Sequence, residues 1–258
     1  MNLKRTCLLF VIWSLVFCSL ASAKEYDGIW FLGFNLNRAP FDRLAVRQAV
    51  AHAIDKGYIA QEIMGEEIVP GSPIPPGMSG HDESLTAYKF NVKYARKLMA
   101  RAGLKINDPA LKSGILLHTD GDKTIVIAQL VREELKKIGI KVTLEQVRYR
   151  DEEKWNSALA GGKFSLFLMG YKGSSGDLFT QEASSDQIDG SKILSPLFDP
   201  GGEANFTGYS DDAFNSLMQK LSLINPALSK EREKKLIEAG RLIYRSLPII
   251  PLFYIEKI

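Results

Sequence analysis

Two polar segments of the chain carry side chains suited to ligand chemistry, and each follows an apolar run. In the first, His118 ends the run over residues 114–118, and Asp120 and Asp122 follow it. Carboxylate oxygens are ligands that a hard cation prefers, and the alternative is a polar turn that caps the next helix. The other positions of a calcium loop are missing from the sequence. The polar turn is therefore favoured, and no metal site is predicted.

The second polar segment covers residues 171–179 and follows the apolar run over residues 164–170. It combines an aromatic ring with small residues and Asp177, a composition that lets a loop approach a small ligand closely. The alternative is a solvated connection between two elements. Of the two segments, this one is the better candidate for binding a small molecule.

Motifs of catalysis are missing from the sequence. It contains no glycine-rich phosphate loop, no dinucleotide fingerprint, no His-Glu-x-x-His helix and no Gly-x-Ser-x-Gly elbow. His52 and His81 stand alone, which is typical of structural histidines. We therefore expect a binding protein without a cofactor rather than an enzyme.

The elements that must position these segments begin with a strand–helix–strand unit. The run over residues 114–118 precedes a helical apolar stripe that Gly139 ends, and residues 140–144 then alternate as a strand. This pattern predicts an α/β fold with parallel strands and a right-handed crossover. A strand over residues 164–170 is expected in the same sheet. Ligands of open α/β sheets bind at the carboxyl ends of the strands, where both polar segments lie.

Further elements are predicted on both sides of this unit. A strand over residues 29–36 and a last strand over residues 248–254 are expected, and the two prolines of the last strand suit a sheet edge or a crossing segment. Residues 69–80 are predicted to form a long structured loop, and residues 171–208 a polar, glycine-rich stretch. The residues expected to cap helices are Asp42, Asn91, Ser210 and Ser229.

Composition and charge are those of an ordinary globular protein. Hydrophobic residues make up 45% and charged residues 24%, with 33 Lys and Arg against 30 Asp and Glu. Two of the basic residues, Lys4 and Arg5, belong to the first 23 positions, so the rest of the chain is close to neutral. This balance argues against nucleic acid or an anionic membrane surface as a partner.

Residues 1–23 are typical of a cleavable signal peptide. Basic Lys4 and Arg5 precede an apolar run over residues 7–20, and Ala21-Ser22-Ala23 supplies a small-residue cleavage site. The apolar run is shorter than the roughly 20 residues that span a bilayer. We expect export to the periplasm, cleavage after Ala23, and no membrane insertion afterwards.

Both cysteines, Cys7 and Cys18, lie within this leader. Residues 24–258 are therefore expected to form a single module without disulfide or thiol chemistry. Lipid attachment at Cys18 is the less favoured alternative, because Phe17 stands where a lipid-attachment motif has a small residue.

Six motifs, in order along the chain, resemble those of one protein family. They are residues 35–55, Ile74-Pro75-Pro76-Gly77, residues 88–103, residues 135–140, Asn205-Phe206-Thr207-Gly208-Tyr209 and residues 247–254. Together they look like the family 5 extracellular solute-binding proteins, which include the dipeptide, oligopeptide and nickel binding proteins of ABC importers. The resemblance implies a lobe of the type II periplasmic-binding-protein kind, with a mixed sheet flanked by helices.

The resemblance covers about half of a typical family member, which has two lobes around a cleft. It implies that residues 24–258 correspond to the second lobe, with the first lobe missing. A lobe alone is expected to bind a peptide-like solute weakly, because one wall of the cleft is absent. The expected protein partners are an ABC permease or a separate protein that supplies the first lobe.

The resemblance also implies the ligand contacts. Peptide-binding relatives carry an aspartate for the peptide amino group in the loop after the matching strand. Ser174 occupies that position here, and Tyr171 replaces the usual tryptophan. Serine accepts a hydrogen bond from an ammonium group but brings no charge, so Asp177 is expected to supply the charge. The predicted ligand-binding residues are Tyr171, Ser174, Gly176 and Asp177.

Two functions are compatible with these features. The first is the substrate-binding component, or one lobe of it, of an ABC importer for peptides or similar small solutes. The alternative is a stand-alone periplasmic interaction module that derives from such a protein and no longer transports. The module would assemble with a protein through the surface that once faced the first lobe.

Overall fold

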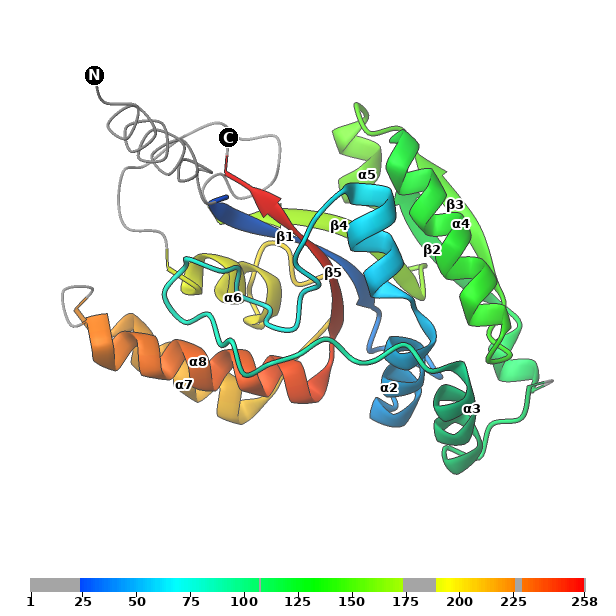
Figure 1. Cartoon of the computed structure of the whole chain (residues 1–258), viewed down its shortest axis with the longest axis horizontal. Coiled ribbons are helices and arrows are strands. Elements are labelled where there is room, and N and C mark those ends of the chain that lie inside the picture. The colour runs from blue at the N-terminus through cyan, green and yellow to red at the C-terminus, as the bar shows by residue number, and fades with distance from the viewer. Residues whose placement is uncertain (1–23, 107, 174–188, 226–228, 258) are drawn as a thin grey trace, which may run out of the picture.

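A five-stranded mixed sheet runs through the computed structural model, which describes residues 24–106, 108–173, 189–225 and 229–257 (Figure 1). The strands are β1 (Tyr26–Phe34), β2 (Gly114–Thr119), β3 (Val142–Val147), β4 (Leu166–Lys172) and β5 (Ile249–Glu256). The α-helices are α2 (Leu44–Ala53), α3 (Val92–Arg101), α4 (Asp122–Lys136), α5 (Glu152–Ala160), α6 (Ser191–Phe198), α7 (Asp212–Ser222) and α8 (Ser229–Ser246). A π-helix η1 (Tyr58–Met64) and a 3₁₀ turn η2 (Pro109–Leu111) complete the described elements.

The strand order is β3-β2-β4-β1-β5. Strand β2 pairs in parallel with β3 and with β4, as the strand–helix–strand pattern predicts. Strand β1 lies between β4 and β5 and is antiparallel to both. The edge position predicted for the last strand is confirmed, and Pro251 lies beside the register shift between Trp30 and Phe31. An edge strand tolerates proline because fewer of its amide groups are needed for pairing.

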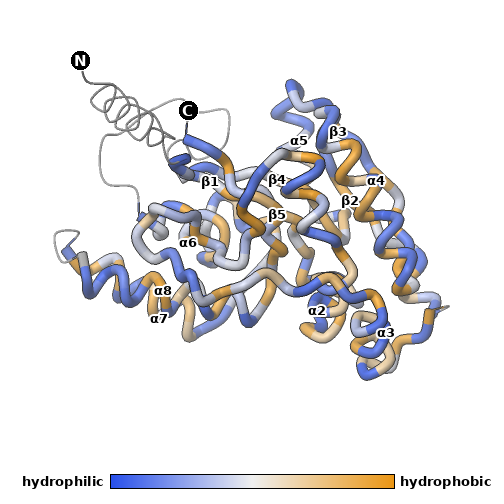
Figure 2. The backbone as a smooth tube through the Cα atoms, in the orientation of Figure 1, coloured by the Kyte–Doolittle hydropathy of each residue, from blue (hydrophilic) through white to orange (hydrophobic). Residues whose placement is uncertain are grey.

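The central strands are buried on both faces. In β4 every residue is buried, and in β1 only Trp30 is partly exposed. Alternate side chains of these strands enter two separate cores, as the two-residue period of a strand requires. One core packs against α2, η1, α3 and α4, and the other packs against α5, α6, α7 and α8. Figure 2 shows apolar residues along the strands and polar residues on the outer turns of α8.

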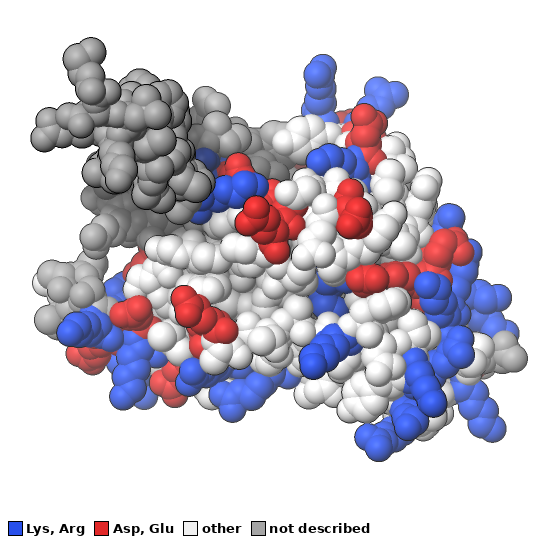
Figure 3. Space-filling model, viewed as in Figure 1, with Lys and Arg blue, Asp and Glu red and all other residues white. Residues whose placement is uncertain are grey.

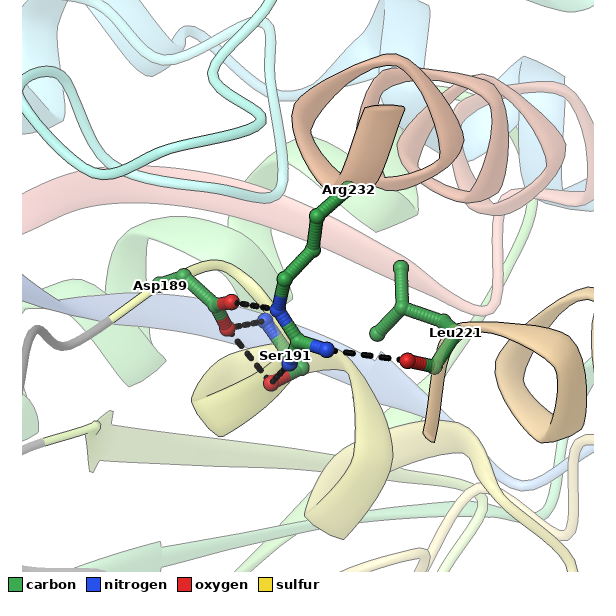
Figure 4. Close-up of polar contacts among 4 residues, drawn as sticks. All are labelled: Asp189, Ser191, Leu221 and Arg232. Atoms are coloured by element: carbon green, nitrogen blue, oxygen red, sulfur yellow. Dashed lines mark hydrogen bonds and ion pairs between the residues drawn. The ribbon is translucent and has the colours of Figure 1, made fainter. Parts of the chain in front are cut away.

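The helices of the second face are joined by a partly buried arginine. Arg232 of α8 forms an ion pair with Asp189 and donates hydrogen bonds to Ser191 Oγ (3.1 Å) and to the carbonyl oxygen of Leu221 (2.9 Å) (Figure 4). Burial works to raise the pKa of Asp189, but hydrogen bonds from Arg232 and Ser191 hold this pKa below its usual range. One guanidinium therefore links the start of α6, the end of α7 and α8.

Two predicted helix caps are wrong by one residue, and one is confirmed. Asn91 accepts a hydrogen bond from the Tyr94 amide, as expected of the residue before α3. Asp42 does not cap α2, because the helix begins one residue later and Arg43 holds the N-cap position. Ser210 does not cap α7, because the carboxylate of Asp211 accepts the hydrogen bond from the Phe214 amide.

The predicted irregular stretch over residues 171–208 contains a helix, α6. Ile193, Leu194, Leu197 and Phe198 are buried on one side of it. The sequence signal for this helix is weak because the helix is short and contains Pro196, and proline is rarely found inside a helix. Burial of the apolar side outweighs that preference.

A lysine is buried at the end of α2. Lys56 is 3% exposed, and its Nζ donates hydrogen bonds to the carbonyl oxygens of Ala51 and Ile54. Burial lowers the pKa of Lys56 to about 8, against the opposing effect of Glu134 and Asp55. The folded chain therefore releases this proton at a lower pH than the unfolded chain does.

Replacing Lys56 with methionine is expected to change how stability depends on pH. Between about pH 8 and pH 10 the unfolded chain keeps the Lys56 proton and the folded chain loses it, so the free energy of unfolding rises with pH. The rise is about 2 kcal/mol over this window. Tyr88, whose pKa is raised to about 12 by burial, opposes the rise only above about pH 10.

Urea unfolding of Lys56→Met at a series of pH values measures this effect. The variant is expected to lose most of the rise, whereas Lys97→Met, which replaces an exposed lysine of α3, is expected to keep it. Equal pH profiles for the two variants would contradict the assignment.

Candidate functional site

The carboxyl ends of β2 and β4 lie at the same edge of the sheet as the start of β1 and the end of β5. Because β2 and β4 are parallel, they end at the same edge. Antiparallel pairing places the start of β1 there as well, with Gly28 opposite Lys172 and Tyr26 opposite Glu256. We call this region, around Tyr26, Asp27, Thr119, Lys172 and Glu256, the strand-end edge. It is the place where open α/β sheets hold ligands.

A buried ion pair lies at the strand-end edge. The ammonium nitrogen of Lys172 is 3.4 Å from Oδ1 of Asp27, and both side chains are largely withdrawn from water. The Gly173 amide donates a 2.8 Å hydrogen bond to the Asp27 carbonyl oxygen and so continues the ladder past β4. Buried pairs contribute little net stability, since desolvation offsets attraction. The pair joins the last residue of β4 to β1 across the sheet.

Tyr171 lies at this edge, but its ring belongs to the core that packs against α5–α8. The side chain is 2% exposed, and its hydroxyl donates a 3.0 Å hydrogen bond to Oε1 of Glu203, an exposed residue. The structure thus ties Tyr171 to a carboxylate beside the edge. Its contact with a ligand stays a prediction, as do the roles of Ser174, Gly176 and Asp177, which lie outside the described residues.

Sequence reasoning missed Asp27, Lys172 and Glu203. The signal for the first two is a single charged residue inside an otherwise apolar strand, which implies a partner across the sheet. The pairing register that joins them cannot be read from either strand alone. Glu203 carries no such signal because it follows two glycines in an irregular segment.

Acidic side chains also gather where β5 ends. Lys24 forms ion pairs with Glu256 and with Glu66, the latter at 3.2 Å between Nζ and Oε2. Hydrogen bonds with Glu256 and then Glu66 raise the pKa of Lys24. The Tyr26 hydroxyl lies 3.5 Å from the same Glu66 oxygen, and its pKa is raised by burial first and then by Glu66. The edge therefore presents carboxylate oxygens that can accept hydrogen bonds from an ammonium group.

The first polar segment connects strands and does not cap a helix. Oδ1 of Asp120 accepts a 2.6 Å hydrogen bond from the Tyr149 amide, which joins the ends of β2 and β3. Gly121 occupies the N-cap position of α4, and no side chain caps it. The predicted polar turn is present, but its predicted capping role is wrong. The Asp120 carboxylate accepts its hydrogen bond from the segment that follows β3 and not from the start of α4. Within the described residues, no group of three His, Cys, Asp or Glu side chains could hold a metal ion.

The sequence matches the profile of the bacterial extracellular solute-binding proteins, family 5 (middle), over residues 17–186. The chain belongs to this family. Similar family 5 proteins include heme-binding protein A of Haemophilus influenzae, 27% identical over 86% of this chain and 38% of its own length. Di/tripeptide-binding protein 2 of Pseudomonas aeruginosa is 24% identical over 84% of this chain and 38% of its own length.

Solved structures of solute-binding proteins share the fold. HbpA2 from Haemophilus parasuis superposes with a TM-score of 0.75 at 22% identity, over 91% of this chain and 43% of that structure. DppA from Helicobacter pylori, in complex with the peptide STSA, gives 0.74 at 22% identity, over 89% and 42%. The type II periplasmic-binding-protein fold with a mixed sheet flanked by helices is confirmed.

The family 5 chain described here spans about two fifths of the length of the relatives that it matches. These relatives are binding proteins, which supports the prediction of a binding function rather than an enzymatic one. Within the described residues, no helix has both the length and the apolar character needed to cross a bilayer.

Proposed function

We propose that this chain is a solute-binding lobe, formed by residues 24–258, that serves an ABC importer for peptides or similar small solutes. The observation that carries the proposal is the strand-end edge, where β2 and β4 end beside the start of β1 and the Asp27–Lys172 pair. Ser174, Gly176 and Asp177 follow β4 in the sequence. Relatives named as di/tripeptide-binding proteins and a solved relative that holds a peptide support this solute class. Residues 1–23 would direct export to the periplasm.

Capture of the solute would be noncovalent. A peptide's ammonium group is a strong hydrogen-bond donor, and the carboxylate of Asp177 would accept from it, with Ser174 as a second acceptor. Gly176 would let the backbone come close to the ligand. Tyr171, held by Glu203, would support this loop from the sheet side. Closure of a first lobe, supplied by the same or another chain, would complete the enclosure and raise the affinity.

Thermal unfolding of residues 24–258 with added peptides tests this function. The probes are a dipeptide and the tetrapeptide Ser-Thr-Ser-Ala, each at millimolar concentration because a single lobe is expected to bind weakly. A ligand that binds only the folded chain at about 100 times its Kd stabilises it by about 2.7 kcal/mol, which raises the Tm by several degrees. We expect such a rise with at least one peptide.

Two controls sharpen this test. N-acetylation of the peptide removes the ammonium group and is expected to abolish the rise, and Asp177→Asn is expected to reduce it. Asp212→Asn, which neutralises an exposed aspartate of α7, is expected to leave it unchanged. If neither free peptide raises the Tm, or if the acetylated peptide works as well, capture of a peptide amino group by this lobe is refuted. Hemin and nickel, tested in parallel, identify another solute of the family instead.

A further inference from the structure

The chain is close to neutral overall, but the surface of α3 is strongly basic. Residues 89–105 contain no acidic residue, and their basic side chains are all exposed. We call this surface the α3 face, formed by Lys89, Lys93, Arg96, Lys97, Arg101 and Lys105. Figure 3 shows Lys and Arg gathered over α3, whereas acidic residues appear mainly over other parts of that view.

The positive charge of the α3 face is not neutralised within the described chain. No described carboxylate lies within ion-pair distance of these six side chains. Arg96 instead donates a 2.7 Å hydrogen bond to the carbonyl oxygen of Lys137, which brings the basic end of α4 beside α3. Elsewhere on the surface, as at Lys136 and Lys154, a basic residue pairs with an acidic neighbour. The α3 face is thus available to an external anion.

Apolar side chains are exposed among these basic residues. Phe90 is 44%, Tyr94 38% and Ile106 55% exposed. Ile106 also lines an open groove of about 450 Å³ that combines apolar and basic side chains. Its lining includes Arg96, Met99, Leu104, Lys105, Ile106 and Ile138. Aromatic rings and branched apolar residues between lysines and arginines are typical of surfaces that bind at a lipid–water interface.

We propose that the α3 face docks the protein on an anionic lipid surface. The basic side chains would lie among the lipid phosphates, and Phe90, Tyr94 and Ile106 would enter the boundary between headgroups and acyl chains. A lipid surface fits better than an acidic protein patch, because the charges lie on long, unpaired side chains spread along a whole helix. Such charges suit a dense, laterally mobile layer of anions.

The position of the α3 face is compatible with solute binding. In Figure 1, α3 lies at the end of the molecule away from the point where β5 reaches the strand-end edge. Docking through α3 would therefore leave the strand-end edge open to solute. The proposal depends on the α3 face alone, and it holds whether or not the lobe captures peptides.

Co-sedimentation with lipid vesicles tests the proposal on residues 24–258. The leader must be absent because its apolar run would bind lipid by itself. Vesicles containing about 30% phosphatidylglycerol in phosphatidylcholine are compared with pure phosphatidylcholine, at about 50 mM and about 500 mM salt. We expect binding to the anionic vesicles at low salt, little binding at high salt, and little binding to pure phosphatidylcholine.

Two matched triple variants locate the docking surface. Lys93→Glu, Lys97→Glu and Arg101→Glu together are expected to weaken binding roughly 100-fold. Lys230→Glu, Lys234→Glu and Arg245→Glu on α8 change the net charge equally and are expected to change it less than about threefold. If charge reversal prevents folding, as circular dichroism would show, the glutamine versions of the α3 variant take its place. Phe90→Ser with Tyr94→Ser is expected to weaken binding to the anionic vesicles at low salt without any change of charge.

Three results would overturn the proposal. The first is no binding of the unmodified protein to anionic vesicles at low salt, which would leave an acidic protein as the partner of this face. The second is equal weakening by the α3 and α8 variants, which would show that only total charge matters. The third is equal binding to neutral and anionic vesicles.

Discussion

Replacing Arg47 with methionine is expected to lower the free energy of unfolding by about 4 kcal/mol. The guanidinium is 7% exposed and donates hydrogen bonds to four backbone carbonyl groups. Two belong to Phe41 and Asp42, at 2.8 and 2.9 Å, and two to Ser246 and Leu247, with the shortest contacts at 2.7 and 3.1 Å. Methionine fills much of the volume but leaves these carbonyl oxygens without their donor.

The distance in sequence between these carbonyls explains the size of the effect. Residues 41 and 42 precede α2, whereas residues 246 and 247 end α8 and lead into β5, so Arg47 holds the two segments together. Burial lowers the pKa of Arg47, and the charges of Asp42 and Tyr209 act in the opposite direction. Arginine remains charged despite this effect, and the carbonyl dipoles stabilise the charge.

Chemical denaturation followed by tryptophan fluorescence measures the loss, with Arg43→Met as the matched control. Among the described residues, the exposed side chain of Arg43 donates a single hydrogen bond of 2.9 Å, to the Ala102 carbonyl oxygen, so its removal is expected to cost less than about 1 kcal/mol. Arg47→Lys keeps the charge but cannot reach all four carbonyls, and an intermediate loss is expected. Equal midpoints for Arg47→Met and Arg43→Met would refute this account.

Replacing Gly33 with valine is expected to cost about 3 kcal/mol, because no space exists for a side chain at that point of β1. A Cβ atom on Gly33 would lie 2.3 Å from two ring carbons of Phe167, its partner on β4. The Phe167 ring is fully buried and packs edge-on against Phe31 and Phe164, at 5.9 and 5.1 Å between ring centres. The ring therefore cannot move aside without disturbing the core.

The control for this prediction is Gly201→Val, since a Cβ atom there meets nothing within 4 Å. Its urea midpoint is expected to match that of the unmodified chain within experimental error. Combining Gly33→Ala with Phe167→Leu removes the ring that causes the clash and is expected to cost less than Gly33→Ala alone. A Gly33→Val midpoint equal to that of Gly201→Val would contradict the packing argument.

Much of the fold follows from local patterns in the sequence. The unit of β2, α4 and β3 is predictable because apolar periodicity changes from two to 3.6 residues and back, with Gly139 between helix and strand. The edge position of β5 agrees with Pro251 in its sequence. The position of β1 between β4 and β5 could not be predicted from residue patterns, because β1 and β4 each carry one charged residue in an otherwise apolar run and either of them suits the centre.

The candidate site was predictable only in part. The rule that ligands bind at the carboxyl ends of strands leads from the sequence to the segment that begins at Tyr171, and the ligand role of that segment stays a prediction. The pairing of Asp27 with Lys172 could not be predicted, because the two residues are far apart in the sequence and only the pairing of β1 with β4 brings them together. The α3 face also could not be predicted from the total charge. Total charge is a sum over the chain, and it does not show that one helix carries basic residues without acidic neighbours.

The pairing of β1 with both β4 and β5 has a consequence for how the protein folds. Strand β1 comes from the start of the described chain and β5 from its end. Strand β1 therefore lacks one of its two partners until β5 has been synthesised. Contacts so distant in sequence slow folding, because the chain loses the entropy of closing a long loop before the strand pairing stabilises it. Until β5 is synthesised, the growing chain would expose an apolar β1 edge, which is a template for aggregation.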